Sequence, residues 1–317
     1  MPVSIGNNAP ELAVLAPERS ALVHAISYAA PTTVADAVSI LAEHGANARM
    51  LAGGTDLIVQ VREKLRDTTV FVDAKHIPDL MQLSVNADGS ATLGAAVPCH
   101  QIYGDDAISA QYPALVDACQ IIGSTGIQGR ASVGGNLCNS GPAGDTIPPL
   151  IVHGAVANIA GANGGRTVAV EDFCTGPSQN VLGDDELLVS LTLPKPAAGS
   201  GSHYLRFIPR NEMDIAEVGA GAAITLDGDT ITAARVSIGA VAPTPLFVAE
   251  AGEALIGQTA GEAAYEVAAN IARDAASPIN DMRGTIAHRK HLSFVLTQRA
   301  LRGAVARARG MEVGHGH

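Results

Sequence analysis

The chain has 317 residues, of which 47% are hydrophobic and 16% are charged, and its 20 basic and 31 acidic side chains give a formal net charge of −11. These values predict a folded protein of two or three domains and exclude an intrinsically disordered chain. The acidic balance, the absence of basic clusters and the scarcity of aromatic residues argue against nucleic acid or an anionic membrane as a partner, which leaves small molecules and other proteins.

The N-terminus and the cysteines bear on the compartment. No basic segment followed by an apolar run opens the sequence, and no apolar stretch reaches the roughly 18 residues of a membrane span. We therefore expect a cytoplasmic protein without membrane insertion. The cysteines lack the local clustering of metal ligands or of a disulfide framework, so reduced structural thiols are expected at Cys99, Cys119, Cys138 and Cys174.

The N-terminal third predicts helices and a glycine turn. Residues 1–20, rich in Ala and Pro, form an expected N-terminal extension. A helix is predicted after Thr33, which stands three residues before Asp36 as in a capping box, and its end is predicted at Gly45. A short apolar segment and a glycine turn then precede a second helix, predicted over residues 57–65.

The next segment combines strands with an unusual glycine-rich stretch. Strands are predicted over residues 69–73 and 91–95, with a hairpin-type turn at Asp88-Gly89 between them. A helix is then predicted to stop at Gly123. Residues 123–144 are nearly uncharged and too glycine-dense for one regular element, so we expect a long functional loop there.

The remainder predicts a β-rich segment, a linker and a small α+β domain. The predicted strands cover residues 155–160, 166–170, 186–193, 204–208, 219–226 and 230–238. Two helices are predicted over residues 259–276 and 285–309. The sequence PAAGSGS at 196–202 has the composition of a linker. The expected domains are therefore residues 21–198 and 203–309, followed by a tail at 310–317.

Two short motifs carry the chemical signal. Ala52-Gly53-Gly54-Thr55-Asp56-Leu57 and Ser132-Val133-Gly134-Gly135-Asn136-Leu137 each place two adjacent glycines before a small polar residue. Glycine tolerates positive φ and lets backbone N–H groups converge on an anion, so two such motifs predict a site for the two phosphates of a dinucleotide. The competing interpretation is that each pair only makes a tight turn. Neither a Rossmann fingerprint nor a P-loop is present.

Other candidate ligands are better explained without a metal. His100 follows Cys99 in what is taken as a strand, where adjacent side chains point to opposite faces. His288 and His291 are spaced for one helix face, but no third ligand is evident. We expect solvated surfaces there, and no metal site and no catalytic side chain in this chain.

Six motifs in order resemble one family. LAGGTDLI at 51–58 and SVGGNLCNSGPAGDTIPPL at 132–150 are similar to the two flavin-binding loops of the FAD subunits of molybdenum hydroxylases, a group that includes the medium subunit of aerobic carbon monoxide dehydrogenase and the FAD domain of xanthine dehydrogenase. The likeness continues through residues 185–194, 204–218, 239–245 and 278–301.

The resemblance implies a fold. We expect an α+β protein with a two-subdomain FAD-binding domain of the vanillyl-alcohol-oxidase (PCMH) type, followed by a small α+β domain of a three-stranded sheet plus helices. It also implies FAD as the cofactor of this chain. The molybdenum-pterin cofactor and the [2Fe-2S] clusters would belong to a large and a small partner subunit, in a heterohexamer with two copies of each chain.

The resemblance also implies roles for individual residues. One FAD phosphate would lie in the first motif and its neighbours, Leu51, Ala52, Gly53, Gly54, Thr55, Asp56, Leu57 and Ile58. The other phosphate would lie at Ser132, Val133, Gly134, Gly135 and Asn136. Asp145 would bind a ribose or ribityl hydroxyl. Ile122 and Leu188 would line the flavin, Tyr204 would cover a face of its ring, and Arg206 would lie near the ring as a cation.

The sequence departs from the family pattern at three points. Many relatives have Gln-Ile-Arg-Asn where this chain has Gly126-Ile127-Gln128-Gly129, so contacts from that Arg and Asn are missing. The Arg206 position is often Lys. No cysteine-rich insertion of the kind found in 4-hydroxybenzoyl-CoA reductase is present, so no additional [4Fe-4S] cluster is expected.

The leading hypothesis is an FAD-binding electron-transfer subunit of a molybdenum hydroxylase, which passes electrons from the [2Fe-2S] clusters of a partner through FAD to an external acceptor. One alternative is a self-sufficient FAD-dependent oxidoreductase with its own substrate pocket. Another is a scaffold whose flavin site is not functional. These residues identify neither the substrate of the complex nor the final electron acceptor.

Overall fold

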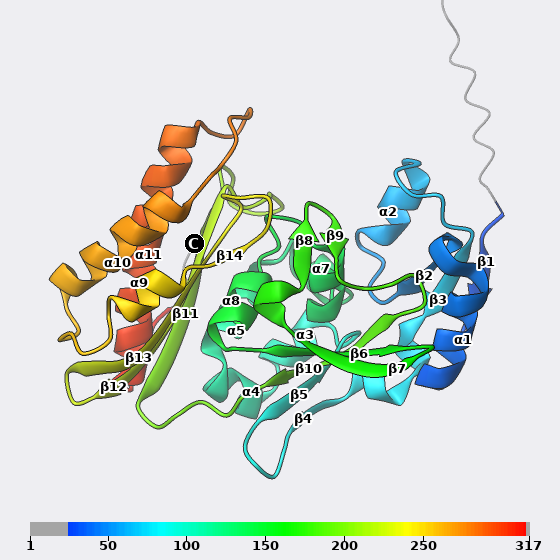
Figure 1. The fold of residues 1–317 in the computed structure, drawn as a ribbon, viewed down its shortest axis with the longest axis horizontal. Coiled ribbons are helices and arrows are strands. Elements are labelled where there is room, and N and C mark those ends of the chain that lie inside the picture. The colour runs from blue at the N-terminus through cyan, green and yellow to red at the C-terminus, as the bar shows by residue number, and fades with distance from the viewer. Residues whose placement is uncertain (1–24, 315–317) are drawn as a thin grey trace, which may run out of the picture.

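Three sheets follow one another along the long axis of the molecule (Figure 1). The computed structural model describes residues 25–314, so the expected extension at 1–20 lies outside the described residues. Within residues 25–314, no helix is both long and apolar enough to cross a membrane.

The first sheet is small and parallel, with the strand order β1-β3-β2. Its strands are β1 (Ser27–Ala29), β2 (Ala48–Leu51) and β3 (Val70–Asp73), and its helices are α1 (Val34–His44) and α2 (Leu57–Arg62). The N-terminus of α1 is as predicted, because the Asp36 amide donates to Thr33 Oγ1 at 3.1 Å. Gly45 ends the helix with a φ of 51°. The second predicted helix is shorter than expected and stops at Arg62.

The second sheet is antiparallel, in the order β4-β5-β10-β6-β7. Its strands are β4 (Leu83–Val85), β5 (Ala91–Gly94), β6 (Val156–Gly161), β7 (Gly164–Ala169) and β10 (Leu187–Leu193), and a separate ribbon pairs β8 (Cys174–Gly176) with β9 (Gln179–Asn180). The turn at Asp88-Gly89 joins β4 to β5, and the predicted partner at residues 69–73 belongs to the first sheet instead. β4 was too short to leave a recognisable pattern.

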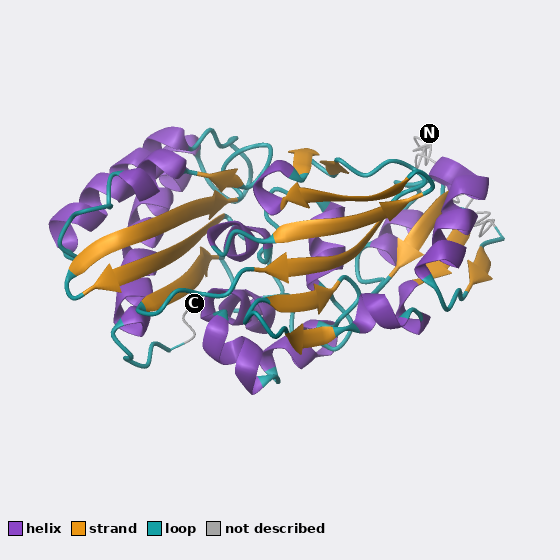
Figure 2. Ribbon diagram, turned by 60° about the horizontal axis from the view of Figure 1, so that its bottom comes forward, coloured by secondary structure: helices purple, strands orange, loops and turns teal. Residues whose placement is uncertain are grey.

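A group of short helices accompanies this sheet, and some of them lie between it and the third (Figure 2). They are α3 (Cys99–Tyr103), α4 (Asp106–Gln111), α5 (Pro113–Ile121), α6 (Thr125–Gln128), α7 (Val133–Asn139) and α8 (Ile147–Val152). The long loop predicted over residues 123–144 is therefore wrong, since it contains α6 and α7. Ser132 caps α7 by accepting from the Gly135 amide at 3.1 Å, which lets a glycine-rich segment begin a helix. Cys99 and His100 lie in helix α3, not in a strand.

The third sheet belongs to the C-terminal part of the chain. It contains β11 (Ser200–Phe207), β12 (Val218–Asp227), β13 (Thr230–Gly239) and β14 (Leu246–Phe247), accompanied by α9 (Ala249–Glu253), α10 (Glu262–Ala275) and α11 (Ile286–Ala308). The sheet thus has a short fourth strand beyond the three that the resemblance implied.

Part of the predicted linker is a packed strand. Residues 200–202 belong to β11, and Ser202 is buried. Gly201 lies so close to the main chain of α11 at Ala304 that a Cβ would fall well inside van der Waals contact. The small residues that suggested flexibility therefore allow a strand to pack closely against a helix.

Helices cover both faces of the third sheet (Figure 1). On one face, Ala220, Ala222 and Ile224 of β12 share a hydrophobic core with α10 and α11. On the other face, Gly221 lies against α8, where a Cβ would meet Pro148 at 3.5 Å. The two parts of the chain therefore share this sheet, and the end of β11 is fixed beside helices of the N-terminal part.

Candidate functional site

A cleft of about 750 Å³ brings the two glycine motifs together. Most of the predicted site residues line it, namely Ala52, Gly53, Gly54, Thr55, Asp56, Leu57, Ile122, Ser132, Gly134, Gly135, Asn136, Asp145, Leu188 and Arg206. Its volume falls within the range of small-molecule and cofactor pockets. Four predicted residues lie outside the lining: Leu51, Ile58, Val133 and Tyr204. Of these, Leu51, Val133 and Tyr204 are buried, whereas Ile58 is exposed.

The first motif turns sharply and contacts the second. Gly54 has a φ of 75°, which a residue with a Cβ rarely adopts. Gly53 has an ordinary φ, but a Cβ there would collide with the main-chain carbonyl of Arg130. The Arg130 side chain strengthens this approach, because its Nε donates to the Gly53 carbonyl at 2.9 Å. Sequence reasoning missed Arg130, since nothing in its local pattern distinguishes it.

The second motif forms the first turn of α7. Neither Gly134 nor Gly135 has a positive φ, so the conformational reason expected for this glycine pair is wrong. Gly134 is needed because a Cβ would collide with the Ala95 main chain. Asn136 Oδ1 accepts from the Thr146 hydroxyl at 2.7 Å. The backbone amides at the start of α7 carry the partial positive charge of a helix N-terminus and lie in the cleft wall.

Gln128 stands at the position where the resemblance implied an Arg, and its side-chain amide forms hydrogen bonds within the chain. Its Nε2 donates to the carbonyls of Gln120 and Ile122 at 2.7 and 3.2 Å, and its Oε1 accepts from Tyr103 at 3.2 Å. Gln128 therefore fixes the backbone at Ile122, which lines the cleft.

Asp145, Tyr204 and Arg206 form a buried network at the β11 end of the cleft. Asp145 Oδ1 accepts from the Tyr204 hydroxyl at 2.9 Å, and its Oδ2 accepts from Arg206 Nη1 at 2.7 Å. Burial raises the pKa of Asp145, although Arg206 and Tyr204 oppose this shift. Burial and the Asp145 charge raise the pKa of Tyr204 well above its ordinary value. Tyr204 packs on Ala114 and Ala118 and does not cover the cleft.

Arg206 has one unsatisfied donor. Its Nη2 donates to the Ile121 carbonyl at 2.6 Å, and its side chain is only 2% exposed. Its Nε is buried and has no hydrogen-bond partner within residues 25–314. A buried N–H without an acceptor costs roughly 1–3 kcal/mol, so this atom suits a ligand that brings an acceptor into the cleft.

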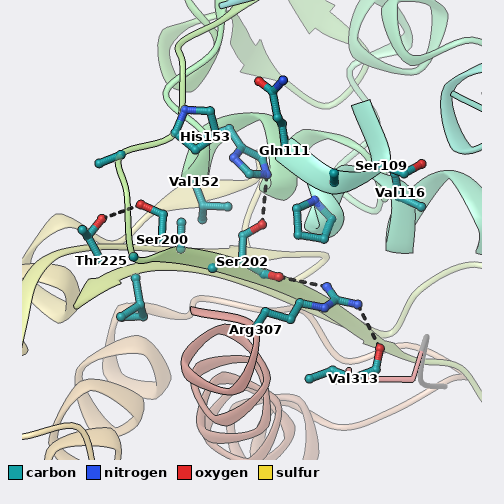
Figure 3. Close-up of a pocket in the computed structure, with 18 of the residues that line it drawn as sticks. Ser109, Gln111, Val116, Val152, His153, Ser200, Ser202, Thr225, Arg307 and Val313 are labelled. Carbon is teal, nitrogen blue, oxygen red and sulfur yellow. Dashed lines mark hydrogen bonds between the residues drawn. The ribbon is translucent and has the colours of Figure 1, made fainter. Parts of the chain in front are cut away.

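A larger cavity of about 1480 Å³ lies between the N-terminal part and the third sheet (Figure 3). Several of the polar side chains that line it are bonded within the protein. Ser202 Oγ lies 3.2 Å from His153 Nε2, and Ser200 bonds to Thr225 at 2.9 Å. Arg307 donates to the Ser202 carbonyl at 2.9 Å and to the Val313 carbonyl at 3.3 Å.

Asp117 holds the junction of the two parts of the chain together. Its carboxylate on α5 accepts from His203 Nδ1 at 2.8 Å and from both terminal nitrogens of Arg307 at 2.6 and 2.8 Å. Burial would raise the pKa of Asp117, but the hydrogen bonds from His203 and Arg307 hold that pKa well below its usual range. This cluster connects α5 with β11 and α11.

The histidines and cysteines form no metal centre in the part of the chain that the structure describes, where no group of three potential ligands is found. Burial raises the pKa of Cys138 to about 12, and burial also raises the pKa of Cys119, so both are protonated thiols at neutral pH. His288 Nε2 lies 3.7 Å from Glu217 Oε1, and His291 is exposed.

Two family models cover most of the chain. Residues 24–196 match the FAD binding domain in molybdopterin dehydrogenase, and residues 203–304 match the CO dehydrogenase flavoprotein C-terminal domain.

Individual proteins match over nearly their whole length. The carbon monoxide dehydrogenase medium chain of Afipia carboxidovorans is 31% identical, over 89% of this chain and 97% of its own length. The xanthine dehydrogenase FAD-binding subunit of Escherichia coli is 30% identical, over 90% of this chain and 97% of its own. A carbon monoxide dehydrogenase structure from Hydrogenophaga pseudoflava aligns with a TM-score of 0.85 at 28% identity, over 89% of this chain and 98% of that one.

Proposed function

Since the chain belongs to the family of FAD-binding medium subunits of molybdenum hydroxylases, we propose that it is the electron-transfer subunit of such a complex. It would receive electrons from [2Fe-2S] clusters in a small subunit and deliver them through FAD to an external acceptor. The substrate would be oxidised at a molybdenum-pterin cofactor in a large subunit.

One observation carries this proposal: the cleft joins two glycine motifs to a buried arginine with an unsatisfied donor. The main chain at Gly53 and Gly134 packs directly against the main chain of Arg130 and Ala95, and this close packing holds both motifs in the wall of one cleft. Arg206 at the β11 end offers the free Nε to an acceptor atom. These features fit a flavin dinucleotide, with phosphates at the glycine motifs and the ring toward Arg206.

The residues of this chain would bind and orient the cofactor. The amides of both motifs would donate to phosphate oxygens, and Ile122 and Leu188 would provide apolar contacts. Asp145 and the Ile121 carbonyl hold the Arg206 guanidinium in place, so its charge is fixed before a ligand binds. Bound FAD would supply a carrier that accepts electrons singly and releases them in pairs.

The titratable side chains that line the cleft are carboxylates, arginines and the Cys138 thiol. No histidine lines it within residues 25–314, and Asp145 is engaged by Tyr204 and Arg206. The relatives named as medium chains support an assembly with a large and a small subunit, which we propose to be a heterohexamer with two copies of each.

Purification of the full-length tagged chain from its native host tests the proposal. We expect flavin absorption with stoichiometric FAD, together with [2Fe-2S] and molybdenum signals, in a complex with one larger and one smaller chain identified by mass spectrometry. A flavoprotein that purifies alone and oxidises a substrate by itself would identify a self-sufficient oxidoreductase. A colourless protein would show that the cleft does not hold flavin in the cell.

A further inference from the structure

Two arginines lie at the end of the cleft opposite Arg206. Arg49 lies on β2 and Arg66 follows α2, and both line the cleft. β2 and α2 lie near one end of the molecule in Figure 1, whereas β11, which carries Arg206, lies toward the other end. The glycine motifs line the cleft as well.

The structure restrains both guanidinium groups. Arg66 Nε donates to Gln60 Oε1 at 2.7 Å, and Gln60 Nε2 donates to Asn139 Oδ1 at 2.8 Å. Arg66 is thereby connected to the end of α7. Arg49 Nη1 donates to the Ala48 carbonyl at 2.8 Å and lies 3.7 Å from Asp184 Oδ1.

Several donors of these arginines have no acceptor. Within residues 25–314, neither terminal nitrogen of Arg66 makes a hydrogen bond, and Nη2 of Arg49 makes none. In that part of the chain, no carboxylate oxygen lies within 4.0 Å of the Arg66 guanidinium. Its single side-chain hydrogen bond goes to the neutral amide of Gln60. Arg66 therefore carries a charge that no carboxylate pairs within residues 25–314, whereas Asp184 partly balances the charge of Arg49.

The two charges also act on each other. Partial burial lowers the pKa of Arg49, the positive charge of Arg66 lowers it further, and Asp184 opposes both effects. Bringing like charges together in a partly enclosed site is unfavourable unless an anion joins them. Guanidinium groups are particularly suited to phosphate, because their donors match its oxygens.

We propose that Arg49 and Arg66 bind the adenylate half of FAD by donating to its phosphate, and so make the cleft select FAD over FMN. This inference rests on the proposed function, which places the flavin ring toward Arg206. FMN lacks the adenylate half, so it would leave both arginines unengaged. Phosphate binding would then combine the amides of the glycine motifs with these two cations.

The test measures the binding of FAD and of FMN to the full-length chain stripped of flavin. Arg49→Gln and Arg66→Gln are compared with Arg62→Gln, a matched control on α2 whose side chain is 71% exposed, bonds to Glu63 and lies outside the cleft lining. Each cleft variant should weaken FAD binding by about tenfold or more, as expected for loss of charge-assisted hydrogen bonds. FMN binding should stay within about twofold of the parent, and Arg62→Gln should change neither affinity.

The outcomes separate this inference from the proposed function. Equal losses for FMN and FAD, or unchanged FAD binding in both cleft variants, would overturn the role of the arginines while leaving the flavin site intact. Binding of neither flavin by the parent chain would overturn the proposed function and this inference with it. Thermal melting of each apo variant checks the fold, and Arg66→Lys, which keeps the charge, should recover part of the FAD affinity.

Discussion

Two cavities of this molecule differ in what their polar groups already contact. The larger one, about 1480 Å³, lies between two parts of the chain, and Ser202, His153 and Arg307 around it bond to one another. The smaller one, about 750 Å³, leaves donors of Arg66 and Arg206 without acceptors in the described part of the chain. A buried arginine donor without an acceptor beside two glycine motifs, more than volume, therefore marks the smaller cavity as the candidate ligand site.

This contrast has a simple energetic basis. A buried polar group that is paired within the protein adds to the free energy of unfolding. An unpaired one destabilises the free protein, and a ligand that pairs with it gains binding free energy. Substitutions at the junction should therefore lower the stability of the protein, and substitutions in the cleft should mainly lower flavin affinity.

The largest effect is expected from Asp117→Ala. This change removes the shared acceptor of His203 and Arg307 and leaves the buried Arg307 guanidinium without its counterion, so the free energy of unfolding should fall by about 3–5 kcal/mol. Denaturant unfolding monitored by circular dichroism measures the loss. Asp106→Ala, at an exposed position in α4, is the control. Equal losses in the two variants would contradict the assigned role of Asp117.

Mild acid should weaken the same junction through His153. Burial lowers the pKa of His153 to about 4, against the opposing charge of Asp117, whereas an unfolded histidine titrates near 6.5. The unfolded state thus binds the proton first, so this contribution is complete above about pH 6.5 and is lost as the pH falls toward 4, by up to about 3 kcal/mol. Unfolding measured from pH 7 to pH 4.5 should show a steeper decline for the parent than for His153→Asn. Parallel profiles would contradict this expectation.

In the cleft, Gly53→Ala should reduce flavin retention. The added Cβ would collide with the Arg130 carbonyl, so the two motifs must move apart, at a cost of about 1–3 kcal/mol. The FAD content of the purified protein, measured after release by heat, reports the effect. Gly129→Ala is the matched control, because a Cβ there meets nothing within 4 Å. Full FAD content in Gly53→Ala would show that the close approach is not needed.

The smallest effect is expected from Tyr204→Phe. The change removes one hydrogen bond to Asp145 but keeps the ion pair with Arg206, so we expect a loss of about 1 kcal/mol in the free energy of unfolding. Because Tyr204 lies outside the cleft lining, FAD affinity should change less than in Arg66→Gln. A larger loss of affinity than of stability would place Tyr204 in direct contact with the ligand.

Local patterns predicted much of the fold. Helix α1 was evident from Thr33 and Gly45, and the long helix α11 from its apolar spacing, because capping and periodicity depend only on neighbouring residues. The elements that sequence reasoning missed, such as β4 and β14, are too short to carry a period. Residues 200–202 were misjudged because small side chains suit both a flexible linker and a tightly packed strand.

The candidate site was predictable only where its residues form a continuous motif. Both glycine motifs were found from their sequence, and the resemblance added Asp145, Leu188 and Arg206 to the cleft. Arg49 and Arg66 were not found, because the folding of the first sheet and of α2 alone brings them to one cleft. The junction at Asp117 was missed for the same reason, since its partners are distant in the sequence.

The contact between Gly53 and Arg130 limits how this protein can change over time. The obstacle to a larger residue at position 53 is a main-chain carbonyl, which every amino acid at position 130 would present. A compensating substitution of a neighbouring side chain therefore has no means of making room. In a genetic selection for flavin binding, a defect at Gly53 should be repaired mainly by reversion, whereas a defect caused by a side-chain collision can find suppressors elsewhere.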